Sequence, residues 1–164
     1  MQGKTTIASI LKQEGVDIVF CFPHNGLIDA VASESIKPII SRMERGAVNM
    51  ADGYSRINNG LNPGVCLVQA GPGIENAFPG VAQAFADSSP ILMLPGHQGT
   101  SREGYSSDFR ASPNYAGVTK WADLINKPER IPEMMRRAYT NLRVGRPRPV
   151  LLEIPADVLN GELD

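Results

Sequence analysis

The sequence of 164 residues contains no long apolar run and no excess of charge of either sign. Its longer apolar stretches, residues 18–22 and 91–94, are far shorter than the roughly 18 residues that a membrane-spanning helix needs. No basic segment followed by an apolar one opens the chain, which argues against a secretory signal. Because 16 basic residues face 17 acidic ones, a nucleic-acid surface, which concentrates positive charge, is not expected either. We therefore expect a cytoplasmic protein that binds neither a membrane nor nucleic acid.

Cysteine is also scarce, and the two present, Cys21 and Cys66, cannot make a disulfide framework. Both lie in apolar runs, where a free thiol typically behaves as a small buried hydrophobe. Hydrophobic residues make up 42% of the sequence and charged residues 20%, a composition that favours a globular core over disorder. The length favours one compact domain over residues 1–164.

Short apolar runs alternate with longer amphipathic ones along the sequence. The short runs predict six strands, at about residues 17–22, 37–41, 65–68, 91–94, 120–124 and 149–154. Helices are expected at about residues 5–14, 26–33, 44–57, 74–86 and 128–143, whereas residues 96–114 show no sustained period and are expected to form a functional loop. This alternation predicts an α/β fold with a doubly wound, mainly parallel six-stranded sheet and helices on both faces.

Ligands reach such sheets at the carboxyl ends of the strands, near a switch in strand order. The residues that follow the predicted strands are therefore the candidates for a functional site. These residues are His24 and Asn25, Met43 and Glu44, residues 69–73, and residues 96–98.

The sequence contains parts of several common motifs, but none of these motifs is complete. Residues 3–6 (Gly-Lys-Thr-Thr) resemble the end of a phosphate-binding loop, but the strand and the earlier glycine that such a loop requires are lacking. Gly71 and Gly73 match two of the three glycines of a dinucleotide-binding turn. His24 and His97 have no Cys or acidic neighbours at ligand spacing, so no protein metal site is expected.

A longer pattern spreads over four segments. Residues 43–56 read MERGAVNMADGYSR, residues 63–68 read PGVCLV, residues 71–77 read GPGIENA and residues 86–90 read ADSSP. In this order and spacing they resemble the N-terminal pyrimidine-binding domain of thiamine-diphosphate-dependent enzymes, in the acetolactate synthase branch. The resemblance extends over residues 5–159 and is therefore more specific than a single short motif.

The resemblance implies that Glu44 hydrogen-bonds N1′ of the cofactor's aminopyrimidine. Proton sharing at N1′ favours the imino tautomer, which prepares the cofactor to attack the carbonyl of a 2-oxoacid. The resemblance also implies cofactor contacts from Gly71, Pro72, Gly73 and Asn76. A simpler interpretation stays open for each feature: Glu44 can be an acid that pairs with a helix dipole, and residues 71–73 an ordinary tight turn.

Six positions are candidates for substrate contact: His24, Asn25, Gln69, His97, Gln98 and Phe109. Gln69 stands where some decarboxylases of the family carry a catalytic histidine, which argues against a mechanism like that of benzoylformate decarboxylase. For His24 the alternative is a histidine that caps a strand end, and for His97 and Gln98 it is structural hydrogen bonding. Phe109 resembles a loop phenylalanine that borders the substrate channel of acetolactate synthases.

In this family the cofactor's diphosphate binds through Mg²⁺ to a Gly-Asp-Gly segment with a downstream Asn, a pattern that this sequence lacks. We therefore expect the chain to bind only the pyrimidine end of thiamine diphosphate. Mg²⁺ and the diphosphate would lie in a diphosphate-binding domain of the same or another chain, and any FAD in a central domain. The expected assembly is a homo-oligomer that acts on a small 2-oxoacid, whereas the chain alone is expected to be inactive.

Two other interpretations remain open. The chain can be the small subunit of a two-chain 2-oxoacid decarboxylase such as sulfopyruvate decarboxylase, or a non-catalytic α/β binding module. The presence of Glu44 argues against the second, because a module without chemistry has no need of an acid at that position.

Overall fold

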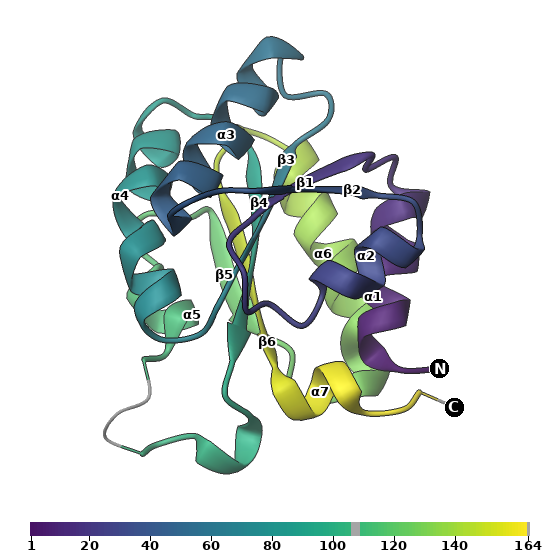
Figure 1. The fold of residues 1–164 in the computed structure, drawn as a ribbon. Coiled ribbons are helices and arrows are strands. Elements are labelled where there is room, and N and C mark those ends of the chain that lie inside the picture. The colour runs from purple at the N-terminus through teal and green to yellow at the C-terminus, as the bar shows by residue number, and fades with distance from the viewer. Residues whose placement is uncertain (106–108, 164) are drawn as a thin grey trace.

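The computed structural model describes residues 1–105 and 109–163, which form one six-stranded sheet covered by helices (Figure 1). All strand pairs are parallel, and the strand order is β2-β1-β3-β4-β6-β5. The predicted α/β fold is thus confirmed. The strands are β1 (Ile18–Cys21), β2 (Lys37–Ile40), β3 (Gly64–Val68), β4 (Ile91–His97), β5 (Trp121–Leu124) and β6 (Val150–Pro155).

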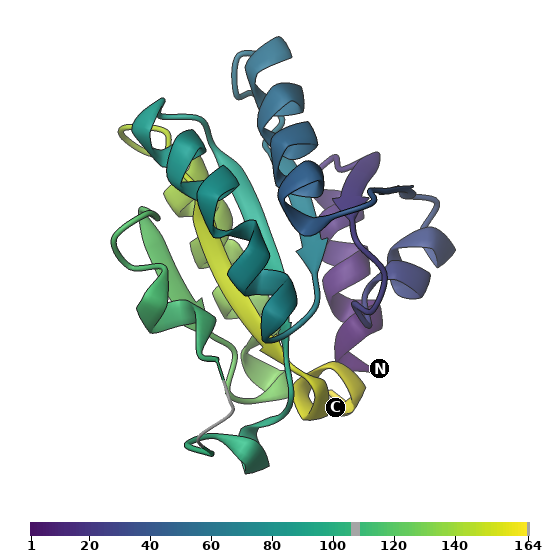
Figure 2. The same cartoon turned by 60° about the vertical axis from the view of Figure 1, so that its left-hand side comes forward.

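Helices lie on both faces of the sheet, as Figures 1 and 2 show from two directions. The longer ones are α1 (Gly3–Gln13), α3 (Glu44–Ile57), α4 (Pro72–Ala86) and α6 (Ile131–Arg143), and the short ones are α2 (Ile28–Ser33), α5 (Ala111–Asn114) and α7 (Ala156–Asn160). Helices α1, α2, α6 and α7 bury side chains against one face, and α3, α4 and α5 against the other. Among the described residues, no helix has the length and apolar character needed to cross a membrane.

Strand β3 shows why several strands read as continuous apolar runs. Val65 and Leu67 belong to the core under α1 and α6, whereas Cys66 and Val68 belong to the core under α3 and α4. Successive side chains of a strand point to opposite faces, so a strand covered on both faces is apolar at every position. Cys21 and Cys66 are both fully buried free thiols, as predicted.

The structure corrects four predicted boundaries or elements. Strand β4 continues past residue 94 because Gly96 and His97 still pair with β6. Residues 96–114 are not one irregular loop, since they include the end of β4, the 3₁₀ turn Thr100–Arg102 and helix α5. Pro128 opens a separate 3₁₀ turn, Pro128–Arg130, before α6, and α7 was not predicted. The short elements span too few residues for a helical period to be visible.

Helices α3 and α4 approach each other closely, and two glycines make the packing of α3 feasible. A Cβ on Gly80 of α4 would lie 2.9 Å from Cγ1 of Val48 on α3, and a Cβ on Gly64 of β3 would lie 2.2 Å from the carbonyl oxygen of Ala51. Real Cβ atoms do not approach neighbours so closely, so only glycine fits at either position. This contact sets the distance between the first turns of α3 and α4, where the candidate site lies.

Candidate functional site

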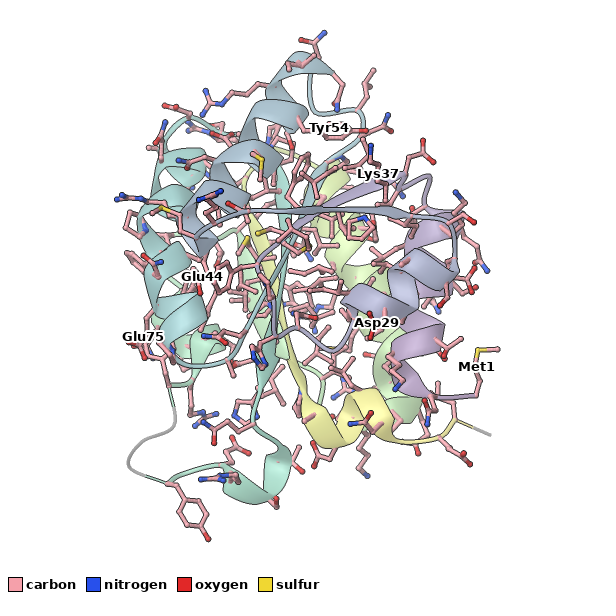
Figure 3. The ribbon with its side chains drawn as sticks, viewed as in Figure 1. Met1, Asp29, Lys37, Glu44, Tyr54 and Glu75 are labelled. Carbon is pink, nitrogen blue, oxygen red and sulfur yellow. The ribbon has the colours of Figure 1, made fainter. Side chains whose placement is uncertain are left out.

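Glu44 is the first residue of α3 and lies just beyond the carboxyl end of β2. Its side chain is nearly buried, with 7% of the residue exposed, above the fully buried Ala47 and Val48. Its Oε2 accepts a hydrogen bond of 2.7 Å from Nδ2 of Asn76, and Figure 3 shows Glu44 beside α4. Met43, the candidate that directly precedes Glu44, is 47% exposed because it lies before the start of the helix.

The turn that begins α4 has the conformation of a tight, glycine-dependent turn. Gly71 has φ of 62° and accepts the first helical bond from the backbone N–H of Glu75 at 3.0 Å. No atom lies within 4 Å of the position of a Cβ on Gly71, so open space adjoins its backbone. Gly73 instead packs on Gln69, since a Cβ there would lie 2.2 Å from Cγ of Gln69. Among the predicted cofactor residues, the structure therefore brings Glu44 and Asn76 into contact, whereas Gly71 is buried and has free space only at the position of a Cβ.

Asn25, predicted as a substrate candidate, is a buried structural residue in this fold. Its Nδ2 donates to the carbonyl oxygens of Val68 at 2.8 Å and Leu94 at 3.0 Å, and its Oδ1 accepts from the backbone N–H of Leu27 at 2.9 Å. The amide thus joins the ends of β3 and β4 to the segment after β1. All three of these bonds are made within the fold, which leaves the Asn25 amide little capacity for a substrate.

His24 and His97 line one cavity of about 330 Å³ at the carboxyl edge of the sheet. His24 is exposed and has φ of 75°, whereas His97 is buried and its Nδ1 accepts from the backbone N–H of Gly99 at 3.1 Å. Lys4 and Asp29 line the same cavity, and Figure 3 shows Asp29 on α2, across the sheet from Glu44. Gln98 is exposed and does not line this cavity.

Phe109 lies away from the other substrate candidates, in an apolar groove beside α4. The groove has a volume of about 480 Å³ and is lined by Glu75, Phe78, Pro79, Phe109 and Asn114. Residues 106–108, which precede Phe109, lie outside the described residues. The structure thus separates the predicted substrate residues into a cavity that contains His24 and His97 and a groove that contains Phe109.

Two buried polar residues near the site were not predicted from the sequence. The hydroxyl of the fully buried Tyr115 donates to the carbonyl oxygen of Ile74 at 2.5 Å, and burial raises the pKa of this phenol well above its usual value. Glu153, 1% exposed on β6, accepts the backbone N–H groups of Ala111 at 3.0 Å and Ser112 at 2.9 Å. A lone acid inside the apolar run of residues 150–155 was a usable signal for Glu153. Tyr115 offered no such signal.

Within the described residues, no group of three or more His, Cys, Asp or Glu side chains could hold a metal ion. The chemical capacity of the site therefore rests on the Glu44 carboxylate and the Asn76 amide, beside the space at the Cβ position of Gly71. A nearly buried carboxylate next to an open, apolar-floored position can bind and exchange a proton with a ring nitrogen.

Comparison with known proteins gives this geometry a context. The family model described as "Thiamine pyrophosphate enzyme, N-terminal TPP binding domain" matches residues 1–121. The chain is 37% identical to a probable acetolactate synthase large subunit of Methanocaldococcus jannaschii, covering 100% of the chain and 28% of the relative. It is 36% identical to the probable 2-ketoarginine decarboxylase AruI of Pseudomonas aeruginosa, covering 93% and 28%. Its identity to the large subunit of acetolactate synthase isozyme 3 of Escherichia coli is 33%, covering 98% and 29%.

The chain thus spans 28% to 29% of the length of these relatives. The family match covers most of the chain, and the observed parallel sheet agrees with the fold that the resemblance implied. The chain therefore belongs to the thiamine pyrophosphate (thiamine diphosphate) enzymes, in which it corresponds to the N-terminal cofactor-binding domain.

Proposed function

We propose that this chain supplies the pyrimidine-binding half of the active site of a thiamine-diphosphate-dependent 2-oxoacid decarboxylase or carboligase similar to acetolactate synthase. The observation that carries this proposal is the Glu44 carboxylate, which lies nearly buried at the amino end of α3 and is held by Asn76. Membership of the family makes thiamine diphosphate the cofactor that this carboxylate would meet.

The residues of the chain suit a flat heteroaromatic ring. Ala47 and Val48 form an apolar floor below Glu44, and no atom fills the position of a Cβ on Gly71 at the start of α4. In such a site water is excluded, so a hydrogen bond between Glu44 and the ring nitrogen N1′ gains strength. When bound, thiamine diphosphate supplies a thiazolium ring that accepts the electron pair released with carbon dioxide.

Glu44 holds and returns a proton at N1′, and this exchange sets the tautomer of the aminopyrimidine. Glu44 is the first residue of α3, where the helix dipole suits a negatively charged side chain. The Asn76 amide keeps its hydrogen bond to the carboxylate. Gly71, Pro72 and Gly73 would place backbone rather than side chains against the ring.

The other half of the active site belongs, in this proposal, to a second domain. The described residues hold no metal cluster, so the diphosphate and Mg²⁺ would be bound by a diphosphate-binding domain of the same or another chain. We propose a homo-oligomeric, cytoplasmic assembly in which any FAD is bound by a central domain. His24 and His97 would face a small 2-oxoacid through their shared cavity, with Gln69, Gln98 and Phe109 as further candidates. Assays of the assembly with pyruvate, 2-oxobutyrate and sulfopyruvate would identify the acid.

Substitution of Glu44 tests the proposed function. In an active assembly that contains this chain, Glu44→Gln should lower turnover by ~10²–10⁴-fold, because the amide cannot donate and take back the proton at N1′. Glu129→Gln is the matched control, since it removes the same charge from an exposed residue that lines neither the cavity of His24 and His97 nor the groove of Phe109, and it should leave turnover unchanged. Wild-type turnover in Glu44→Gln would refute the proposed role.

A further inference from the structure

The carboxylate of Glu44 is fixed through one of its two oxygens. Oε2 accepts the 2.7 Å bond from Asn76, and across residues 1–105 and 109–163 no group hydrogen-bonds Oε1. A short bond to an ionised carboxylate is charge-assisted and roughly twice as strong as a neutral one. Because a glutamate side chain otherwise samples several rotamers, holding one oxygen also decides where the other points. We propose that Asn76 is a positioning residue, which occupies Oε2 and so presents Oε1 to the aminopyrimidine. This inference rests on the proposed function.

The bond between Glu44 and Asn76 is one of two successive contacts along the same pair of helices. Glu44 and Val48 are four residues apart on α3, and Asn76 and Gly80 are four residues apart on α4, so each pair lies on one helix face. Gly80 packs on Val48 so closely that a Cβ there would lie 2.9 Å away. The apolar contact one turn further along therefore sets the spacing at which the amide of Asn76 reaches the carboxylate.

The first turn of α4 is held from its other side by Tyr115. The hydroxyl of Tyr115 donates to the carbonyl oxygen of Ile74, two residues before Asn76, at 2.5 Å. The ring of Phe78, one turn after Ile74, meets the Tyr115 ring edge-on with centroids 5.1 Å apart. Both contacts fall on the first two turns of α4, so Tyr115 resists any rotation of these turns that would move Asn76.

Tyr115 is itself fixed in place because it directly follows α5. The carboxylate of Glu153 on β6 accepts the two backbone N–H groups at the start of α5, and the backbone N–H of Tyr115 bonds the carbonyl oxygen of Ala111 at 3.0 Å. A continuous set of bonds thus runs from the sheet through α5 to the turn that carries Asn76. Tyr115 is the second positioning residue in this inference, and it acts on Glu44 through Ile74 and Asn76.

The test is a measurement on the chain without cofactor. In ¹⁵N–¹H NMR spectra, the side-chain amide pair of Asn76 should have a different chemical shift from that of Asn59, and should exchange more slowly with solvent. Asn59 is an exposed residue whose side-chain amide has no hydrogen-bond partner among the described residues. Glu44→Gln removes the charge that Asn76 bonds, and Tyr115→Phe removes the hydroxyl while keeping the ring. Each variant should move the Asn76 signals at least halfway toward those of Asn59.

Two variants control for general effects. Glu75→Gln removes a charge next to Asn76 and should leave its signals in place if the carboxylate of Glu44 is the partner. Tyr139→Phe removes another buried hydroxyl, one for which no hydrogen-bond partner is found among the described residues, and should also leave them in place. Unmoved Asn76 signals in Glu44→Gln would overturn the role of Asn76. Equal shifts in Tyr115→Phe and Tyr139→Phe would overturn the role of Tyr115.

Kinetics of the active assembly provide a readout that general destabilisation would not reproduce. Asn76→Ala should lower kcat with KM unchanged, and the Glu44→Gln/Asn76→Ala double variant should lose no more turnover than Glu44→Gln alone. Additive losses of turnover in the double variant would contradict the claim that Asn76 acts through Glu44. This kinetic test does not depend on whether Tyr115→Phe folds. If Glu44→Gln retains wild-type turnover, the proposed function fails. If it loses turnover while the Asn76 signals stay unmoved in both variants, only the positioning inference fails.

Discussion

At the scale of single residues, two buried polar side chains at the carboxyl edge of the sheet, Asn25 and Glu44, have different roles. The sequence analysis placed both of them in the functional site. Asn25 uses its whole amide to join β3 and β4 to the segment after β1. Glu44 uses one carboxylate oxygen within the fold and keeps the other unbonded among the described residues. Oε1 is not among the buried side-chain atoms that lack a partner, so it stays accessible to water or to a ligand.

The raised pKa of the buried Cys21 thiol predicts how the stability of the fold depends on pH. Burial raises its pKa from 9.0 to about 11, so the folded state keeps the thiol protonated at pH values at which the unfolded chain ionises it. This contribution to stability is fully present below pH 9 and is lost as the pH rises towards 11. Urea unfolding across this range should show a declining free energy of unfolding. Cys21→Ala should decline less steeply, and an identical slope in the variant would contradict the assignment.

At the scale of elements, the accuracy of helix prediction followed the length of the helix. Helix α3 was predicted over residues 44–57, as observed, because fourteen residues display an apolar face of Ala47, Met50, Ala51 and Tyr54. Helix α5 has four residues, and its start is fixed by Glu153, which is 42 positions away in the sequence from Ala111. A contact between such distant positions leaves no periodic trace in the local sequence, so residues 96–114 gave no sign of a helix.

The two hydrogen bonds that Glu153 accepts predict how much this residue stabilises α5. Glu153→Leu leaves the buried N–H groups of Ala111 and Ser112 without acceptors and should lower the free energy of unfolding by about 2–3 kcal/mol. Both amides should then exchange with solvent faster. Glu129→Leu, at an exposed position, should change stability by less than about 0.5 kcal/mol. Equal stability losses in the two variants would show that Glu153 does not anchor α5.

At the scale of the whole molecule, a parallel sheet places the carboxyl ends of all its strands at one edge. This geometry explains why residues far apart in the sequence, such as His24 and His97, share a cavity at the edge where the sequence predicts the functional site. The sequence could not predict that Glu44 would bond Asn76, because that contact depends on the spacing of α3 and α4 at Val48 and Gly80. The family pattern predicts which residues form the site, and helix packing places Glu44 and Asn76 in contact.

The central claim is that the carboxylate of Glu44 bonds the pyrimidine of thiamine diphosphate. The most direct measurement is a crystal structure of the assembled enzyme with the cofactor bound. We expect Oε1 of Glu44 within about 2.5–3.0 Å of N1′, with Asn76 still bonded to Oε2. A bound cofactor whose pyrimidine makes no contact with Glu44, or a Glu44 carboxylate turned to solvent beside an occupied site, would contradict the claim.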